Sequence, residues 1–73
     1  MTIFKTIIKG NMTPVQFLQE SVDDLSIEEI KRVIQQSGFV INSQVVSNPE
    51  VLIDFKTGDI VTFKLNDLQF DIV

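Results

Sequence analysis

The chain has 73 residues, a net charge of −4, and no Cys, His, Trp or Tyr. A chain of this length is predicted to form one small domain, over residues 1–73, and the absence of Cys and His excludes disulfide bonds and thiolate or imidazole metal sites. The acidic balance disfavours nucleic acid and anionic membranes as partners, because both attract basic patches, and no apolar run reaches transmembrane length, so we expect a cytoplasmic protein.

The N-terminal third predicts one strand followed by one helix. Residues 2–9 are rich in Ile, Thr and Phe, which favours a strand that ends at Gly10. Thr13 and Gln16 have the spacing of a capping box, and apolar residues recur at helical spacing after them. This helix is expected to end near Asp23.

A second helix is predicted from a stronger capping box that begins at Ser26. Glu28 has the correct spacing to form ion pairs with Lys31 and Arg32, three and four residues later. Gly38 is expected to end the helix in the left-handed conformation that glycine adopts without strain.

The remainder reads as strand in four segments: 39–47, 51–55, 59–65 and 68–73. The last two alternate strictly, and a two-residue turn at Asn66–Asp67 would place their apolar side chains on one face. The predicted cross-strand pairs are Leu65 with Leu68, Phe63 with Phe70, and Val61 with Ile72.

A three-residue loop with Gly58 left-handed would join segment 51–55 to the same sheet, pairing Val51 with Phe63 and Ile53 with Val61. We therefore predict a two-layer α+β fold of order β-α-α-β-β-β(-β), in which a mostly antiparallel sheet with a C-terminal meander packs on two helices.

The register of segment 39–47 is left open by the sequence. Either Phe39, Ile41 and Val45 point inward, or Val40 and Val46 do. The polar residues 42–44 in its middle indicate a sheet edge or the lining of a groove, and an edge could accept a strand from a partner.

Catalysis has few candidate groups in this chain. No Ser-hydrolase, phosphate-loop or dinucleotide motif occurs, and the three glycines already have turn or cap roles. We expect no enzyme activity, no catalytic residue, no cofactor and no metal site.

Two groups of residues are candidates for an interaction surface. The first is apolar and is predicted to lie on the outer sheet face: Leu52, Ile60 and Val73. It adjoins the last strand, which is expected to be an open sheet edge. Scattered apolar residues are also common on ordinary surfaces, so both interpretations stand.

The second group is acidic and surrounds the link between the helices: Glu20, Asp23, Asp24, Glu28 and Glu29. It could dock a basic partner or mimic a nucleic acid. Alternatively, these are solvated charges, and the acids in a first helical turn simply complement the helix dipole.

Small size, acidity and missing catalytic residues are typical of accessory or inhibitor proteins, including phage-borne ones. The first hypothesis is a protein-interaction module that binds a larger protein or forms a homodimer. The second is a nucleic-acid-associated regulator, which would require Lys5, Lys9, Lys31 and Arg32 to converge, although Lys on an edge strand is also a guard against aggregation. A third, a small enzyme or ligand carrier, would require a deep pocket.

Overall fold

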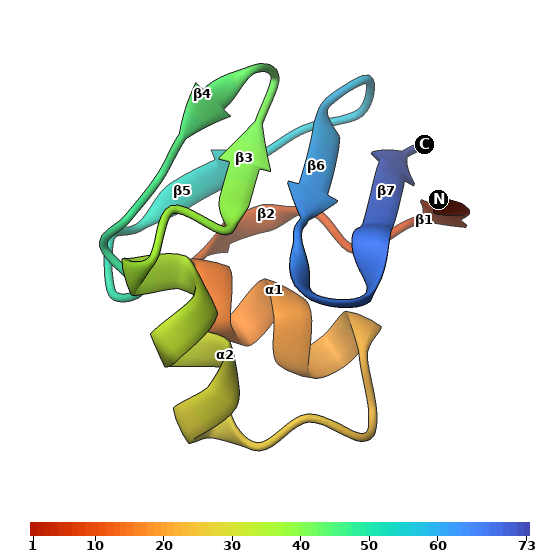
Figure 1. Cartoon of the computed structure of the whole chain (residues 1–73). Helices are drawn as coiled ribbons and strands as arrows, with labels where there is room; N and C mark the ends of the chain where they lie inside the picture. The colour runs from red at the N-terminus through yellow and green to blue at the C-terminus, as the bar shows by residue number, and fades with distance from the viewer.

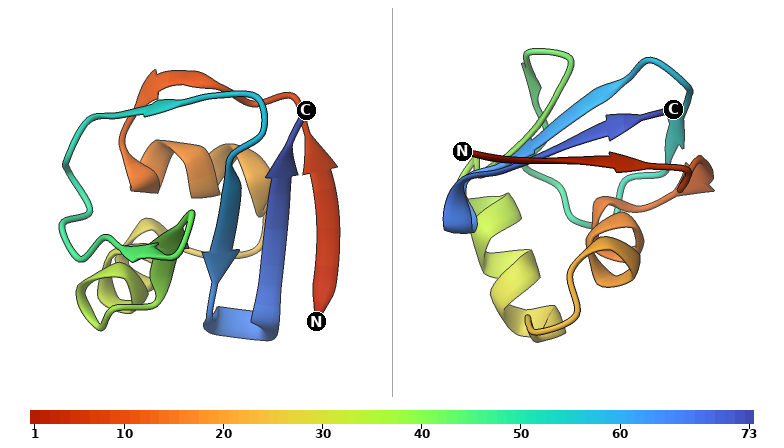
Figure 2. Two further views of the ribbon diagram at one scale, coloured as in Figure 1. Left: turned by 90° about the horizontal axis from the view of Figure 1, so that it is seen from above. Right: turned by 90° about the vertical axis from the view of Figure 1, so that its right-hand side faces the viewer.

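The computed structural model describes residues 1–73 as two helices beneath a five-stranded sheet, with a two-stranded sheet across one end of it (Figures 1 and 2). The predicted α+β class is confirmed. The elements are β1 (Thr2–Thr6), β2 (Gly10–Met12), α1 (Pro14–Ser21), α2 (Ile27–Gln35), β3 (Phe39–Ile41), β4 (Gln44–Val45), β5 (Ile53–Phe55), β6 (Ile60–Phe63), a 3-10 turn (Leu65–Asp67) and β7 (Leu68–Ile72).

Both helices begin where their side chains can cap them. The Thr13 hydroxyl accepts the Gln16 backbone N–H at 3.2 Å, and the Gln16 side chain accepts the Thr13 backbone N–H at 3.0 Å. The reciprocal bonds satisfy two donors that a helix start leaves free, which confirms the first capping box. The Ser26 hydroxyl likewise accepts the Glu29 backbone N–H at 3.2 Å. The Glu29 side chain accepts from the Ser26 hydroxyl at 3.4 Å and not from its backbone N–H, so the capping box predicted as the stronger one is only half formed.

The end of α2 differs from the prediction. Ser37, with φ of 65°, takes the left-handed conformation, and Gly38 does not. The Gly38 N–H donates to the Val33 carbonyl at 2.8 Å, and a Cβ at Gly38 would clash with a Val33 methyl. Gly38 is therefore needed for a close approach of the chain to the helix, rather than for its φ.

The ion pairs predicted from Glu28 are absent. Neither Lys31 nor Arg32 lies within 4 Å of it, and Lys31 instead pairs with Glu50 at 3.4 Å. The segment before β5 brings Glu50 over α2, so a tertiary contact replaces the expected local one.

The strand order of the large sheet is β1-β7-β6-β3-β4, with β1 parallel to β7 and all other pairs antiparallel. The prediction that the last strand is an edge is wrong, because the N-terminal strand covers it. The edges are β1 and β4.

The hairpin of β6 and β7 has the predicted faces but a different register. Val61 faces Phe70, and Phe63 faces Leu68, so each pair is shifted by two residues from the prediction. The connection has four residues, because Leu65 leaves the ladder for the 3-10 turn. A shift of two keeps every side chain on its face, and Val61, Phe63, Phe70 and Ile72 are all buried.

The predicted C-terminal meander is wrong in its first strand. β5 does not join β6 but pairs antiparallel with β2. The predicted strand 2–9 is accordingly shortened to β1, and Gly10, expected to end it, begins β2 instead. Crossing the sheet end buries Phe55 against Phe17, with ring centroids 4.6 Å apart. Val51, expected inside, is exposed, while Gly58 is left-handed as predicted, with φ of 96°.

Segment 39–47 is a hairpin rather than one strand. Asn42 and Ser43 both have positive φ, as a tight two-residue hairpin turn requires. Phe39 and Ile41 are buried in the core before the turn, whereas Val45 after it is half exposed. The polar run therefore forms the turn and opens the edge strand β4, in agreement with the edge interpretation.

One aromatic row links these elements. Phe39 contacts Phe55, Phe55 stacks on Phe17, Phe17 meets Phe70 edge-on at 5.8 Å, and Phe70 stacks on Phe4 at 5.6 Å. The first four rings are buried among the twelve residues of the core, and only Phe4 is exposed. The row therefore runs from the core to the β1 edge.

Candidate interaction site

The main chain of β1 offers free hydrogen-bonding groups. The Thr6 carbonyl accepts the Val73 N–H at 2.8 Å, so Thr6 directs its backbone groups towards β7. Because direction alternates along a strand, Ile3 and Lys5 direct theirs outward. Figure 2, right, shows β1 across the front of the molecule with no element over it. The edge can therefore accept another strand.

Phe4 is the aromatic side chain of this edge. It faces the helical layer with Phe70, its partner in the ladder, yet 46% of its surface is exposed. The cause is the reach of α1, whose Phe17 covers Phe70 but extends no further. The inner side of β1 is thus left partly uncovered beside the helix.

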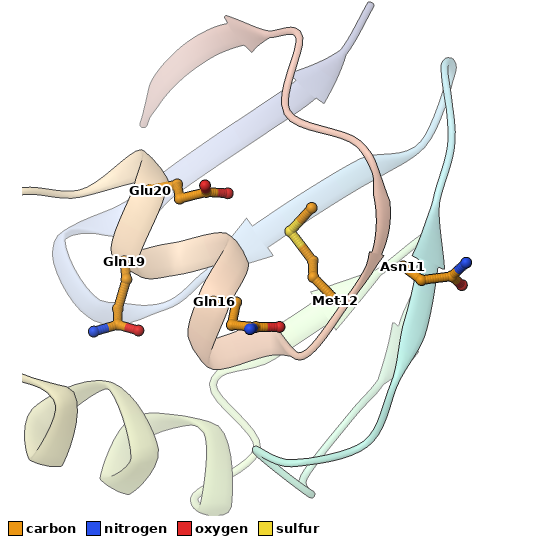
Figure 3. Close-up of a pocket in the computed structure, with 5 residues that line it drawn as sticks. All are labelled: Asn11, Met12, Gln16, Gln19 and Glu20. Atoms are coloured by element: carbon orange, nitrogen blue, oxygen red, sulfur yellow. The ribbon is translucent and has the colours of Figure 1, made fainter.

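Three hollows follow this uncovered strip. One of about 350 Å³ lies between β2 and α1 (Figure 3), one of about 190 Å³ lies beside Phe4 and Ile8, and one of about 300 Å³ lies beside Phe4 and Leu68. Glu20 lines the first and second, and Phe4 and Ser21 line the second and third. Because neighbouring hollows share lining residues, we treat the three as one feature and call it the edge groove.

The edge groove has an apolar floor and a polar rim. Its floor is formed by the apolar side chains Phe4, Ile8, Met12, Val22, Leu68 and Phe70. Its rim includes the acidic residues Glu20, Asp23 and Asp24 and one basic residue, Lys5, which lines the same hollow as Glu20. In Figure 3 the Glu20 side chain extends over the first hollow, whereas that of Gln19 points away from it. The acidic residues flank Phe4: Glu20 on the Ile8 side, Asp23 and Asp24 on the Leu68 side.

None of these three carboxylates forms an ion pair within the chain. The structure contains three ion pairs within 4 Å, which use Asp67, Glu50 and Asp54 as their acids. Glu20, Asp23 and Asp24 are exposed and belong to none of them. Lys5 is the one basic residue that lines the groove, so three carboxylates stand against one ammonium and the net charge of the lining is negative. A cationic group would be attracted there, most strongly at the end with Asp23 and Asp24.

The other predicted acidic residues lie apart from the groove. Glu28 and Glu29 occupy the first turn of α2, as the dipole argument expects, and line no hollow. Of the predicted acidic group, the structure therefore places only Glu20, Asp23 and Asp24 at the groove. No group of three potential ligands is arranged to hold a metal ion.

The predicted apolar group is divided. Ile60 and Val73 lie at the outer face of the five-stranded sheet, 44% and 48% exposed, while Leu52 precedes β5 of the other sheet. On the outer face Ile3 and Val45 are also exposed, but they share it with the polar and charged residues Lys5, Thr62, Gln69 and Asp71. This face is mixed in character, as a solvated sheet face commonly is.

A hydrogen-bonded clamp closes the far side of the sheet. The Asp59 carboxylate accepts the Asn42 side-chain amide at 2.8 Å and the Lys56 backbone N–H at 2.9 Å. The Asn42 side-chain oxygen accepts the Ile60 backbone N–H at 2.9 Å. The Asn42 bond first, and the Lys56 N–H second, hold the pKa of Asp59 below its ordinary value of 3.8. These bonds hold the Asn42–Ser43 turn against the start of β6, so they have a structural role.

The basic residues named in the nucleic-acid hypothesis come from different layers. Lys5 lies on β1, while Lys31 and Arg32 lie on α2 beneath the sheet. The Lys9 ammonium donates to the Val73 carbonyl at 3.1 Å and the Thr57 hydroxyl at 3.0 Å. These side chains are therefore spread over separate elements.

Neither helix has the length or the apolar character needed to cross a membrane. Comparison with protein-family models and with curated proteins finds no match to this chain.

Phe4 and Ser21, which line both hollows beside β1, were not identified from the sequence. The adjacent apolar residues Ile3 and Phe4 must face opposite sides of a strand, but Ile7–Ile8 and Val45–Val46 show the same pattern, so it was not a specific signal. The position of β1 beside β7, which opens the groove, had no local signal.

Proposed function

We propose that this chain is a small non-enzymatic protein-interaction module, acting as an accessory or inhibitor of a larger protein, and that β1 with the edge groove is its binding surface. The observation that carries the proposal is the coincidence of three features at one strand. These are outward main-chain groups at Ile3 and Lys5, a half-exposed aromatic ring, and unpaired carboxylates.

Each feature supports a different part of binding. Main-chain groups supply hydrogen bonds to an added strand, and alternate side chains in adjacent pockets supply selectivity. An aromatic side chain at the centre of a patch is the type of residue that dominates interface energies. Rim charges raise the association rate and reject partners of the wrong sign.

The experiment compares proline variants at the two sheet edges. Lys5→Pro removes an outward N–H from β1 and places a ring at the edge, while keeping the amides that face β7. Val45→Pro is the matched control, because Gln44 pairs with Ile41 beside the turn and Val45 therefore directs its N–H outward from β4.

Tagged wild-type chain and both variants would be used to capture proteins from the native host. We expect a partner that wild type and Val45→Pro retain and Lys5→Pro loses. A partner that Lys5→Pro retains at equal level would contradict the surface, and a strictly monomeric chain that captures nothing would contradict the function.

A further inference from the structure

We propose, building on that function, that the edge groove takes an extended segment of the partner with the pattern basic–x–apolar–x–basic, added as a sixth strand beside β1. The pattern is set by the order in which the apolar ring and the carboxylates lie along β1.

The apolar position follows from Phe4. Side chains of an added strand alternate between the two faces, so every second one points to the groove side with Phe4. The residue directly opposite Phe4 meets an exposed ring with hollows of about 190 and 300 Å³ on either side. An aliphatic or aromatic side chain fills this position best, because it removes apolar surface of both partners from water.

The basic positions follow from the rim. Groove-facing neighbours two residues before and two after the apolar residue lie towards opposite ends of β1. One end lies near Leu68, Asp23 and Asp24, and the other lies near Ile8 and Glu20. Lys or Arg at both positions would meet carboxylates that have no ion-pair partner within the chain. The pattern is symmetric, so it suits either direction of the added strand.

A second copy of this chain fits the groove less well. In β1 the groove-facing positions are Thr2, Phe4 and Thr6, so a symmetric β1–β1 pair would supply the apolar centre without any basic flank. It would also bring two sets of unpaired carboxylates towards one axis in chains that each carry a charge of −4. Like charges across an interface oppose association, so the observations favour a basic partner over a homodimer.

The test is a selection from a library of random nine-residue peptides on the full chain, followed by fluorescence anisotropy with the enriched peptides. We expect Lys or Arg on both sides of an apolar residue at a spacing of two, and binding that weakens as salt is raised. Lys5→Pro should reduce affinity by roughly tenfold or more, whereas Val45→Pro should leave it unchanged.

Two triple variants of equal net charge distinguish the effect of the groove carboxylates from the general attraction between an acidic protein and a basic peptide. Glu20→Gln/Asp23→Asn/Asp24→Asn should weaken binding by about tenfold. The control Glu28→Gln/Glu29→Gln/Glu50→Gln removes the same three charges away from the groove, and it should have little effect. All six side chains are exposed, and circular dichroism would verify the fold of both variants.

A charge exchange gives the sharpest result. Glu20→Lys/Asp23→Lys/Asp24→Lys should reject the basic peptide and bind its Glu–x–apolar–x–Glu counterpart. Equal weakening by both triple variants, enrichment of acidic or unpatterned peptides, or no peptide binding at all would overturn this inference.

The experiments distinguish a wrong peptide pattern from a wrong binding function. Peptides of another pattern that Lys5→Pro abolishes would overturn the basic–apolar–basic inference and support the proposed function. A dimer in analytical ultracentrifugation that disappears with Lys5→Pro would do the same, because the edge would then be occupied by a second copy.

Discussion

The two edges of the five-stranded sheet differ in almost every respect that matters for strand addition. β4 has two residues and follows a tight turn tied to β6 through Asn42 and Asp59. β1 has five residues, free main-chain groups and a half-exposed Phe4. A very short edge gives an incoming strand little to pair with, whereas a long one must be guarded or used. Lys5 is the only charged residue in β1, which leaves most of this edge unguarded.

The difference arises from how each edge is anchored. β4 is joined to its partner β3 by a two-residue turn, so residues that are neighbours in sequence hold it in the sheet. β1 runs parallel to β7, and a parallel neighbour cannot be connected by a tight turn. Its side-chain anchor in the core is the contact of Phe4 with Phe70.

The largest expected effect tests that anchor. Phe70→Ala should lower the free energy of unfolding by about 3–5 kcal/mol, because it removes the buried ring that joins Phe17 to Phe4. Phe4→Ala should cost only about 1 kcal/mol, since half of that ring is already in water. Urea unfolding of both variants measures this, and equal losses would show that β1 is not a peripheral strand.

The next effect distinguishes the two sides of β1. Thr6→Pro removes an N–H that faces β7 and should destabilise the fold by about 1–3 kcal/mol. Lys5→Pro removes an outward N–H and should cost less than about 1 kcal/mol. Thermal unfolding would report the order, and a larger loss for Lys5→Pro would mean that the assigned outward direction is wrong.

A smaller effect concerns the clamp at the opposite edge. Asp59→Ala should lower stability by about 1 kcal/mol at neutral pH, because the carboxylate accepts bonds from Asn42 and Lys56. The pKa of Asp59 is lower in the folded chain than in the unfolded one, so ionised Asp59 stabilises the fold above its ordinary pKa of 3.8.

The pH dependence of this contribution has a defined sign. It decreases as the pH falls from about 4 through the lowered folded pKa, because protonation weakens the bonds that the carboxylate accepts. The stability difference between wild type and Asp59→Ala, followed by urea unfolding between pH 7 and pH 2, should narrow in that acidic range. A constant difference would mean that the charge of Asp59 has no part in the clamp.

The last prediction needs no substitution and concerns the rates of amide hydrogen exchange in the wild-type chain. We expect the amides of Ile3 and Lys5 to exchange much faster than that of Thr6, because only the last faces β7. At β4 the amide of Val45 should exchange fast and that of Gln44 slowly. A bound basic peptide should then slow the two β1 amides and leave Val45 unchanged, which would extend the comparison of the edges to the complex.

Side-chain faces and helix starts were accessible from the sequence because they depend on neighbours in the chain. The period of two in residues 59–73 identified Val61, Phe63, Phe70 and Ile72 as inner residues, and all four are buried. The capping residues Thr13 and Ser26 likewise identified the starts of α1 and α2, although only Thr13 forms the full reciprocal box. Each depends on a spacing that local geometry sets.

Strand pairing was accessible only in part: the hairpin of β6 and β7 was predicted, but its register and the partner of β5 were not. The β6–β7 register is two residues from the predicted one, which alternation cannot detect because a shift of two restores every face. β5 pairs with β2 and not with β6, because its position across the end of the sheet buries Phe55 against Phe17 and Phe39.

The candidate site likewise has a part that the sequence could identify and a part that it could not. Glu20, Asp23 and Asp24 could be named from the sequence as an acidic group, but Phe4 could not be identified as their neighbour. Which residues point inward and where helices begin was determined by the chain itself, through periodicity and capping. Which strand lies at the edge, and so whether a groove exists, was decided only by the tertiary structure, because pairing β1 with β7 joins the two ends of the chain and depends on the burial of side chains distant in sequence.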